Sequence, residues 1–489
     1  MVQCDERARA IVARKDIINC LRIEDFSELF EVHELIGEGG FGKVHRVRNR
    51  VTGMSRAVKT IRKDGILDYA AFIEEVEALA QLDHPRIIKL VGFFEEEEEA
   101  KLVFEICTGP DLFDKMLEVR QSGRPMPLEE VSLIFRQMMN AVVACNERGL
   151  MHRDIKPENF MIKSKDKQGM HSSIKLIDLG LAKKYKTKED VVMDKPCTGT
   201  LIYMAPECIN GEYGRKCDVW SLGALFFFML TGEPLFDQQK GETVILKMLK
   251  NKYCTRARLR KIKPETHPWV TEEARDLLWR MLENNPADRI SIEEALAHPF
   301  IVGGLMAKQE SENQAGQTAF DPQILAQMQS FAQLPALKKA AVTIIAHFCS
   351  ERNTVLQRKT FRKMDKNSSG EVSQEIMEKF LTETCGLRLP DDWSDVLSAI
   401  RSSEGNVTYL QFLAATLPRN IYINNECLCR MAFRLIDSKK DGRITADDLK
   451  ETFVSGGLST PEVIISEVAV DGAGYVDYEG FRAMMLNDN

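Results

Sequence analysis

The octapeptide His152-Arg153-Asp154-Ile155-Lys156-Pro157-Glu158-Asn159 precedes, across an apolar run that ends at Ile177, the tripeptide Asp178-Leu179-Gly180. Asp154 can accept the proton of a hydroxyl group, and Lys156 can neutralise a transferring phosphoryl group beside it. Asn159 and Asp178 can together hold Mg²⁺ through oxygen atoms. Separate chemical roles within so short a stretch predict the active site of a group-transfer enzyme.

A glycine cluster lies earlier in the chain, in the segment Gly37-Glu38-Gly39-Gly40-Phe41-Gly42-Lys43-Val44. Glycines at this spacing let backbone amides approach phosphate oxygens because no Cβ atom intervenes. The same spacing followed by a helix would suggest a dinucleotide site, but here residues 43–47 continue as a strand. Lys59 on the next expected strand could hold phosphates, and Glu75 on the helix expected over 69–82 could fix that lysine.

This ordered set resembles the eukaryotic protein kinase family over roughly residues 30 to 300. The segment from Thr200 to Glu207 resembles the end of an activation segment, and the segment from Asp218 to Gly223 resembles the buried helix behind it. Arg289 is then the family's partner for Glu207. The resemblance implies an α+β, two-lobed fold with a β-rich N-lobe and a helical C-lobe. It also implies ATP and Mg²⁺ as cofactors and Ser/Thr-containing proteins as substrates.

The same resemblance assigns roles to individual residues. The implied catalytic residues are Asp154, Lys156, Lys59 and Glu75, and the implied Mg²⁺ ligands are Asn159 and Asp178. Phe104 would be a bulky gatekeeper, Glu105 and Cys107 would meet the adenine, and Asp111 would lie near the ribose. The full implied ATP-binding set is Ile36, Gly37, Glu38, Gly39, Gly40, Phe41, Gly42, Val44, Ala57, Lys59, Phe104, Glu105, Cys107 and Asp111.

Lys156 together with Thr200 resembles the serine/threonine branch of the family and not the tyrosine branch. Leu179 stands where many kinases have phenylalanine, but it is apolar and can fill the same packing role. The alternative function is a pseudokinase or scaffold that binds nucleotide and partners without phosphotransfer. Because the implied catalytic and metal-binding residues are all intact, the sequence favours an active serine/threonine kinase.

Arg153, next to Asp154, calls in this family for an anion from the activation segment. The candidates are two phosphosites, Thr198 and Thr187, and two permanent charges, Asp194 and Glu189. The sequence does not choose among these four residues. The resemblance further implies a preference for basic residues upstream of the acceptor, through the acids Glu158, Asp111 and Asp114.

Beyond residue 353 the chain repeats a pattern in which a glycine precedes an apolar residue at fixed offset. The four copies are Gly370-Glu371-Val372, Gly405-Asn406-Val407, Gly442-Arg443-Ile444 and Gly474-Tyr475-Val476. With helical flanks, they predict an all-α array of paired helix-loop-helix units. A kinase domain followed by such repeats resembles the calcium-dependent protein kinases of plants and apicomplexan parasites, whose C-terminal region is a calmodulin-like EF-hand domain.

Most of the calcium ligands expected in such loops are replaced. EF-hand loops bind Ca²⁺ through oxygens at positions 1, 3, 5, 7 and 9 and through a bidentate glutamate at position 12. The second loop has Ile400 and Gln411 at its first and last positions, and the fourth has Ala469 and Gly480. Weak calcium ligands remain in the first and third loops, at Asp365, Asn367, Ser369, Glu371, Asp437, Asp441, Arg443 and Asp448.

Even these two loops are incomplete. The first ends on Ile376, and the third has the ammonium group of Lys439 at position 3 and the short Asp448 at position 12. A dication that loses half of its carboxylates loses much of the attraction that offsets its dehydration. We therefore expect any Ca²⁺ binding to be weak, and calcium regulation to be weakened, lost or transferred to a partner.

An amphipathic segment from Ile324 to Phe348 joins the two regions, and Pro335 within it predicts two short helices or one kinked helix. In the family this junction is autoinhibitory, and Lys338-Lys339 could mimic a basic substrate. The alternative is an ordinary linker helix whose lysines face solvent. The expected organisation is an N-terminal extension (1–29), a kinase domain (30–300), a linker (301–321), the junction helix (322–352) and a calmodulin-like domain (353–489).

Composition sets outer limits on function. A net charge of −7 over 489 residues gives no indication of nucleic-acid binding. The apolar stretch Val219 to Leu230 is shorter than the roughly 18 residues of a membrane span and predicts a buried helix. The N-terminus lacks a secretory pattern, and Val2 excludes N-myristoylation, while palmitoylation of Cys4 stays open. Twelve scattered cysteines favour reduced thiols and a cytoplasmic protein.

Overall fold

The computed structural model describes residues 17–18, 21–22, 25–39, 42–66, 68–123, 125–162, 174–178, 183–185, 191–193, 199–303, 323–349, 354–365, 369–401, 405–423, 425–453, 461–469 and 473–487. The chain divides into two compact units. The first unit combines residues 1–83, 89–106 and 319–489, and the second combines residues 84–88 and 107–318.

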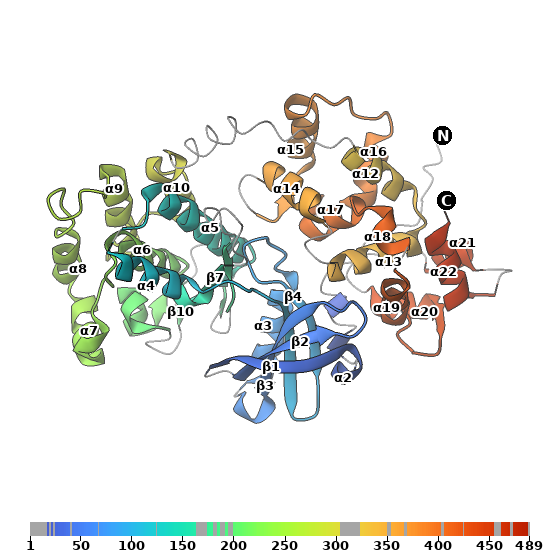
Figure 1. Ribbon diagram of the computed structural model, residues 1–489, viewed down its shortest axis with the longest axis horizontal. Coiled ribbons are helices and arrows are strands. Elements are labelled where there is room, and N and C mark those ends of the chain that lie inside the picture. Colours follow the sequence, from blue (N-terminus) through green and yellow to red (C-terminus); the bar gives the residue numbers. More distant parts are fainter. Residues whose placement is uncertain are drawn as a thin grey trace. The chain divides into compact units, whose positions relative to one another are not determined.

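A five-stranded antiparallel sheet opens the first unit, in the order β1-β2-β3-β5-β4 (Figure 1). Its strands are β1 (Phe30–Gly39), β2 (Gly42–Asn49), β3 (Ser55–Arg62), β4 (Leu90–Glu95) and β5 (Glu99–Glu105). The short α2 (Phe26–Leu29) precedes the sheet, and α3 (Tyr69–Gln81) lies where the apolar spacing predicted a helix. Phe26, Phe30 and Phe94 pack their rings together with centroids 5.3 to 5.8 Å apart, which anchors α2 on the sheet.

The apolar segment that starts at Ile87 forms a strand, β4, only from Leu90 onward. Ile87 forms an isolated parallel bridge with Leu176, and the Ile88 N–H donates to the Leu176 carbonyl at 2.8 Å. These contacts place residues 84–88 in the second unit. The apolar pattern could not predict that the strand starts at Leu90, because the residues before and after this point are equally apolar and buried.

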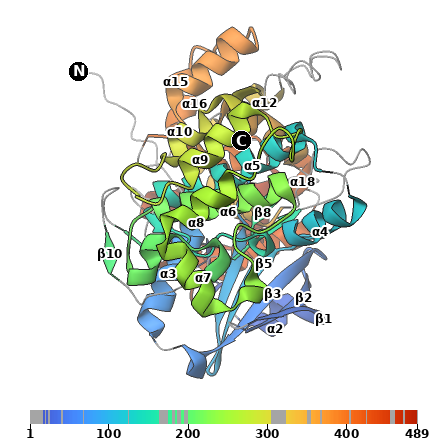
Figure 2. The same cartoon turned by 90° about the vertical axis from the view of Figure 1, so that its left-hand side faces the viewer.

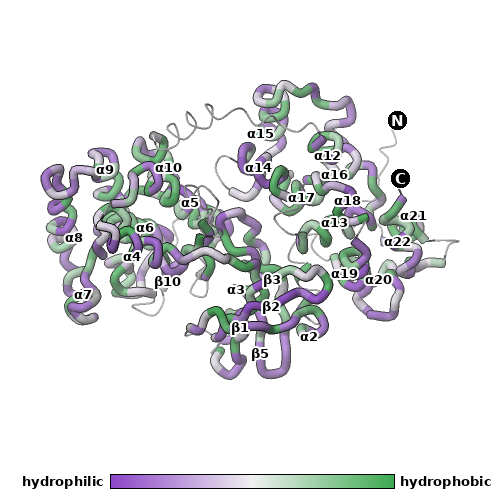
Figure 3. Tube along the Cα trace, viewed as in Figure 1, coloured by the Kyte–Doolittle hydropathy of each residue, from purple (hydrophilic) through white to green (hydrophobic). Residues whose placement is uncertain are grey.

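Two helices, α12 (Gln323–Gln333) and α13 (Ala336–Phe348), follow in the first unit, with Pro335 as the N-cap of α13. Pro335 therefore separates two helices, which decides between the two predicted outcomes. Every residue of α13 except Lys339 is buried, and α13 packs against α17 and α19. Figure 3 shows the corresponding hydrophobic colour along α13. A helix that is apolar on nearly all sides needs such enclosure.

The four predicted repeats pair two by two. The first two meet through β12 (Glu371–Val372) and β13 (Val407–Thr408), and the last two through β14 (Arg443–Thr445) and β15 (Tyr475–Asp477), both antiparallel. The helices of this region are α14 (Val355–Met364), α15 (Gln374–Lys379), the π-helical η7 (Phe380–Thr384), α16 (Trp393–Ile400), α17 (Tyr409–Ala415), α18 (Arg419–Ile423), α19 (Glu426–Ile436), α20 (Ala446–Thr452), α21 (Pro461–Val468) and α22 (Tyr478–Leu486).

The second unit is mainly helical (Figure 2). Its α-helices are α4 (Leu112–Ser122), α5 (Leu128–Glu147), α6 (Lys216–Thr231), α7 (Glu242–Lys250), α8 (Lys252–Leu259), α9 (Glu272–Met281) and α10 (Ile292–Leu296). Its short strands are β6 (Leu150–Met151), β7 (Phe160–Ile162), β8 (Ile174–Leu176), β9 (Lys183–Lys184), β10 (Val192–Met193) and β11 (Glu212–Tyr213).

The helix α6 contains the apolar stretch from Val219 to Leu230, all of it buried as predicted, and it packs against α5 and α9. Among the residues that the structure describes, none of the helices combines the length and apolar character required to cross a bilayer.

Candidate active site

The octapeptide folds into a polar cluster around Asp154, just beyond β6. Lys156 donates from Nζ to Asp154 Oδ2 at 2.7 Å. Thr200 donates to Asp154 Oδ1 from its hydroxyl at 2.8 Å and from its backbone N–H at 3.0 Å. Lys156 Nζ also reaches the Thr200 hydroxyl at 3.3 Å. The structure thus brings together the residues predicted for proton transfer, charge neutralisation and serine/threonine specificity.

The carboxyl group of Asp154 is held in its ionised form. Burial raises its pKa, but hydrogen bonds from Lys156 and Thr200 and the charge of Lys156 outweigh burial, so the pKa lies below its usual value. A fixed, ionised carboxylate beside an ammonium group can accept a proton from a bound hydroxyl group. The ammonium group can then stabilise an anionic group that forms next to it.

Asn159 and Asp178 lie at one end of the antiparallel pair β7 and β8. The Ile177 N–H donates to the Asn159 carbonyl at 2.9 Å, and Asp178 follows directly in the chain. The Asn159 side chain donates from Nδ2 to the Asp154 carbonyl at 2.8 Å, which leaves the amide oxygen as its ligand atom. An amide oxygen and a carboxylate are hard donors of the kind that Mg²⁺ accepts alongside substrate phosphates, so these residues fit that metal.

Asp218 holds the backbone of the loop that carries Asp154, a role that was not predicted from the sequence. Its fully buried carboxylate accepts the backbone N–H groups of His152 and Arg153, each at 2.8 Å. Burial raises the pKa of Asp218 above its usual value. An acid at the edge of the apolar stretch that begins at Val219 is the signal that could have indicated this role, because a buried carboxylate needs donors.

The phosphate-binding residues predicted in the first unit lie on neighbouring strands of its sheet. Lys59 on β3 lies opposite Val44 on β2 and opposite Leu102 on β5. Gly42 has a φ of +134°, and a Cβ atom there would lie 2.1 Å from the Thr60 carbonyl oxygen, so glycine is required. The remaining predicted residues of this part are placed on β1 (Ile36, Gly37, Glu38 and Gly39) and on α3 (Glu75).

The predicted hinge begins at the end of β5. The Glu105 N–H donates to the Lys89 carbonyl at 3.0 Å, and the Glu105 carboxylate accepts the Lys89 N–H at 2.9 Å. The side chain thus serves the sheet, and any contact of Glu105 with adenine would come from its main chain. The gatekeeper candidate Phe104 is half-buried and lies opposite Ala57 on β3.

Two further predicted residues lie in the second unit. Cys107 is half-buried, and Asp111 caps α4 because its Oδ1 accepts the Asp114 N–H at 2.8 Å. Other predicted residues lie outside the described residues, namely Gly40, Phe41, Leu179, Thr187, Glu189, Asp194, Thr198 and Asn367.

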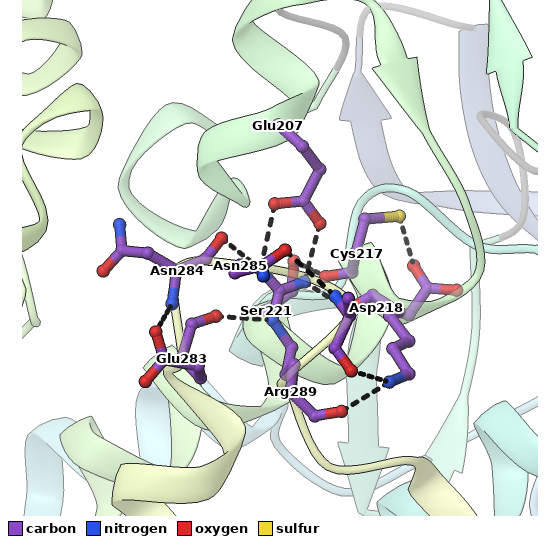
Figure 4. A network of polar contacts seen from close by, with 10 residues as sticks. Glu207, Cys217, Asp218, Ser221, Glu283, Asn284, Asn285 and Arg289 are labelled. Carbon is purple, nitrogen blue, oxygen red and sulfur yellow. Dashed lines mark hydrogen bonds and ion pairs between the residues drawn. The ribbon is translucent and has the colours of Figure 1, made fainter.

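The expected ion pair of Arg289 and Glu207 is present in the second unit (Figure 4). Arg289 donates from Nη1 and Nη2 to the two carboxylate oxygens of Glu207, at 2.6 and 2.9 Å. It also donates to the carbonyls of Lys216 and Glu283, at 2.7 and 2.9 Å. Its side chain is 0% exposed, and its guanidinium carbon lies 5.2 Å from the Trp220 ring centroid. The pair therefore fixes the segment after Thr200 to α6.

We expect Arg289→Met to destabilise the second unit by about 3 to 5 kcal/mol, because it leaves the Glu207 carboxylate and two carbonyls without their donor. The urea midpoint of unfolding of the full chain measures this loss. Arg256→Met is the matched control, since Arg256 pairs with Glu283 at 3.5 Å with 41% of its side chain exposed. That variant should lose at most about 1 kcal/mol. Equal losses in both variants would contradict a special role for the buried pair.

Comparison with known proteins places the chain in a family. Residues 30–301 match the protein kinase domain, residues 356–375 match the EF hand, and residues 426–486 match the EF-hand domain pair. The chain is 32% identical over 475 residues to calcium-dependent protein kinase 3 of Plasmodium berghei (strain Anka), which covers 95% of this chain and 80% of the relative. The chain belongs to the calcium-dependent protein kinase family.

Two further relatives support this assignment. The chain is 31% identical over 490 residues to calcium-dependent protein kinase 5 of Plasmodium falciparum (isolate 3D7), covering 96% of this chain and 81% of the relative. It is 29% identical over 479 residues to calcium-dependent protein kinase 34 of Arabidopsis thaliana, covering 96% and 86%. The predicted family and the predicted α+β kinase fold with a helical EF-hand region are confirmed.

In this member of the family, the first EF-hand loop keeps its opening geometry but lacks its closing ligand. Asp365 accepts the N–H groups of Ser369 and Gly370 at 2.9 and 3.0 Å, and the Ser369 hydroxyl donates to the Glu371 carbonyl at 2.9 Å. At the twelfth position, the apolar side chain of Ile376 is 42% exposed. No oxygen is available there to replace the bidentate glutamate.

In the third loop, the acid at position 12 is hydrogen-bonded to other residues of the loop. Asp448 is 0% exposed, and its Oδ1 accepts the Ser438 hydroxyl at 2.8 Å and the Lys439 N–H at 3.2 Å. Its Oδ2 accepts the N–H and the hydroxyl of Thr445, the former at 2.8 Å. Burial raises the pKa of Asp437 above its usual value, and the nearby Asp441 and Asp448 add to the shift. Throughout the described ranges, no three or more His, Cys, Asp or Glu residues gather as a metal site.

The junction helix α13 corrects one expectation. Lys338 is 1% exposed and donates to the Asn487 carbonyl at 2.6 Å, and burial lowers its pKa to about 8. It does not face solvent, as a lysine of an ordinary linker helix would. The alternative in which both lysines face solvent is therefore wrong for Lys338, and the substrate mimicry by Lys338-Lys339 stays a prediction. The long side chain of Lys338 reaches past the apolar surface of α13, which the hydrophobic pattern alone could not show.

Proposed function

We propose that this chain transfers the γ-phosphate of ATP to serine and threonine residues of protein substrates, with calcium regulation weakened or lost. The observation that supports the proposal is the hydrogen-bonded cluster of Asp154, Lys156 and Thr200, with Asn159 bonded to the Asp154 carbonyl. A pseudokinase would require a defect in this set, and each of its members is present with its expected partner.

In the proposed reaction, Asp154 orients the substrate hydroxyl group and takes its proton as the oxygen attacks the γ-phosphorus of ATP. The bond between that phosphorus and the β–γ bridging oxygen breaks, and ADP leaves. Lys156, bonded to Asp154 at 2.7 Å, lies where it can stabilise the charge on the transferring group. Asn159 and Asp178 would hold Mg²⁺, which when bound supplies neutralisation of phosphate charge. The Thr200 hydroxyl fixes the positions of the Asp154 and Lys156 side chains relative to each other, because it contacts both.

We propose substrates with basic residues upstream of the acceptor. Asp114 and Glu158 are exposed acids of the second unit, and Asp111 is half-buried at the start of α4. Because an arginine side chain can bind a carboxylate through two hydrogen bonds, exposed acids favour basic peptides.

The calcium part of the proposal rests on two features of the first unit. The third loop satisfies Asp448 with protein donors, and the first loop offers Ile376 where a carboxylate is needed. The junction helix α13 is nevertheless enclosed between the repeats. An EF-hand region that holds its helix by apolar packing has little need of an ion to do so.

The test is a kinase assay with Mg·ATP on a peptide with upstream arginines and a serine acceptor, run in Ca²⁺ and in chelator. We expect phosphate transfer at rates that differ by less than about twofold between the two conditions, because only ligand-poor loops are present. Transfer should cease when Mg²⁺ is omitted.

The same peptide with tyrosine or with alanine as acceptor is the specificity control, and neither should be phosphorylated. Absence of transfer together with tight binding of a fluorescent ATP analogue would establish the pseudokinase alternative. Activation by Ca²⁺ of tenfold or more would overturn the calcium part of the proposal and leave the kinase part intact.

A further inference from the structure

Tyr213 is a buried tyrosine in contact with the arginine that precedes the proposed base. It ends β11 and is 3% exposed. Arg153 donates from Nη1 to the Tyr213 hydroxyl oxygen at 2.6 Å, and its guanidinium carbon lies 6.0 Å from the centroid of the ring. The phenol thus offers both an acceptor for a charge-assisted hydrogen bond and a ring face within cation–π range.

The position of Arg153 bears directly on Asp154 because the two are consecutive residues in a strained turn. Arg153 has a φ of +68°, which a residue with a side chain adopts only where its surroundings enforce it. Its N–H is bound by Asp218 at 2.8 Å. On its other side, a Cβ atom at Gly199 would lie 2.4 Å from the Arg153 carbonyl oxygen. The backbone of Arg153 is therefore fixed by Asp218, and its side chain is held by Tyr213.

Tyr213 also connects this turn with the activation segment. The strand β11 pairs antiparallel with β10, and Tyr213 lies opposite Val192 while Glu212 lies opposite Met193. A residue in this place pairs through its strand with one part of the activation segment and is bonded through its hydroxyl to the catalytic turn. Tyr213 can thus couple the position of β10 to the position of the turn at Arg153.

We propose that Tyr213 is a positioning residue for phosphotransfer, in which its hydroxyl group holds Arg153 and thereby orients Asp154 relative to β10. The inference rests on the proposed kinase activity and deepens it. Tyr213 touches neither substrate nor nucleotide in this scheme, and it acts alongside whatever anion the activation segment provides. Its effect should therefore appear in kcat and not in the KM for ATP.

The first test is Tyr213→Phe, which keeps the ring and removes only the hydroxyl group. We expect kcat to fall by about three- to thirtyfold, since a hydrogen bond to a charged group is lost at a turn that carries the base. The KM for ATP should stay within about twofold of the wild type. The matched control is Tyr185→Phe, because the Tyr185 hydroxyl donates to a different partner, the Asn146 carbonyl, at 2.6 Å. Its kcat should be unchanged.

A double-mutant cycle separates positioning from general stability. In an Arg153→Met background, Tyr213→Phe should cause no further loss of kcat, because its partner is already absent. An equal loss in both backgrounds would overturn the inference, as would an unchanged kcat of Tyr213→Phe in the wild-type background.

Hydrogen–deuterium exchange of the full chain gives a readout that does not require activity. Peptides that cover residues 153–159 should exchange faster in Tyr213→Phe than in the wild type and in Tyr185→Phe. If the wild type transfers no phosphate, the proposed function fails and this exchange alone decides the inference. Unchanged exchange in these peptides would then overturn it, whereas faster exchange would support the link between Tyr213 and the turn.

Discussion

Asp154→Asn is expected to lower kcat by about 10²- to 10⁴-fold, the range that a positioned general base contributes. Asparagine has nearly the same shape, and its single amide oxygen can keep the hydrogen bonds that Thr200 donates to Oδ1. The amide NH₂ at the position of Oδ2 cannot accept the hydrogen bond from Lys156. Asparagine also cannot take the proton of the attacking hydroxyl group. Initial rates of peptide phosphorylation at saturating Mg·ATP measure the effect, and the KM for ATP should change little because Asp154 bonds to the loop and not to the nucleotide in our scheme.

The control for this variant is Asp237→Asn in the same unit. Asp237 is exposed and accepts the Gln239 N–H at 3.0 Å, so its replacement tests the loss of a carboxylate outside the site. Its kcat should equal that of the wild type. Asp237→Asn should keep the wild-type unfolding midpoint because the side chain is exposed, whereas Asp154→Asn should lower it because the ion pair with Lys156 is lost. An Asp154→Asn protein that phosphorylates the peptide as fast as the wild type would refute the proposed mechanism.

Local chemistry could be predicted from the sequence because the residues concerned are close together in the chain. Asp154, Lys156 and Asn159 lie within six positions, and a turn of that length leaves few ways to arrange them. Their partner Thr200 was also predictable, since family resemblance joins it with Lys156. The helix α3 and the buried helix α6 followed from apolar spacing, which is strong in long elements.

Contacts between distant segments could not be predicted in this way. The hydrogen bond from Arg153 to Tyr213 joins residues 60 positions apart, and the pairing of β10 with β11 that places Tyr213 has only two residues on each strand. Periodicity is undefined in elements so short. Composition likewise gave no reason to expect that His347, near the end of α13, would lie against β4, where its Nε2 atom is 3.0 Å from the Val91 carbonyl oxygen.

The calcium loops are a third case: the sequence predicts weakened Ca²⁺ binding, and the structure shows which contacts the remaining ligand residues make instead. The ammonium group of Lys439 at position 3 and the short Asp448 at position 12 of the third loop indicate weak binding. They do not indicate what replaces the ion. The structure shows that Ser438 and the Lys439 main chain donate to Asp448, so that the shorter acid is drawn toward the start of the loop.

Restoring two ligands in this loop should create a calcium site. In Lys439→Asp/Asp448→Glu, position 3 gains a carboxylate and position 12 gains the longer acid that can bind in a bidentate manner, beside the existing Asp437 and Asp441. We expect the full-length variant to bind one Ca²⁺ with a Kd of about 10⁻⁷ to 10⁻⁵ M, as in sensor EF-hands, whereas the wild type should show no site tighter than about 10⁻⁴ M. Titration calorimetry at millimolar Mg²⁺ measures both constants.

The matched control is Lys450→Asp/Asp447→Glu, which changes the net charge by the same amount at residues of α20 that are not loop ligands. Lys450 and Asp447 are exposed by 52% and 66% and lie 3.9 Å apart, so the new charges stay in solvent and should bind no ion. A micromolar site in the wild type would refute the view that these loops are degenerate. In the Lys439→Asp/Asp448→Glu protein the ligand set is complete at every acidic position. If this protein binds no Ca²⁺, the conformation of the loop backbone, and not its side-chain ligands, prevents binding.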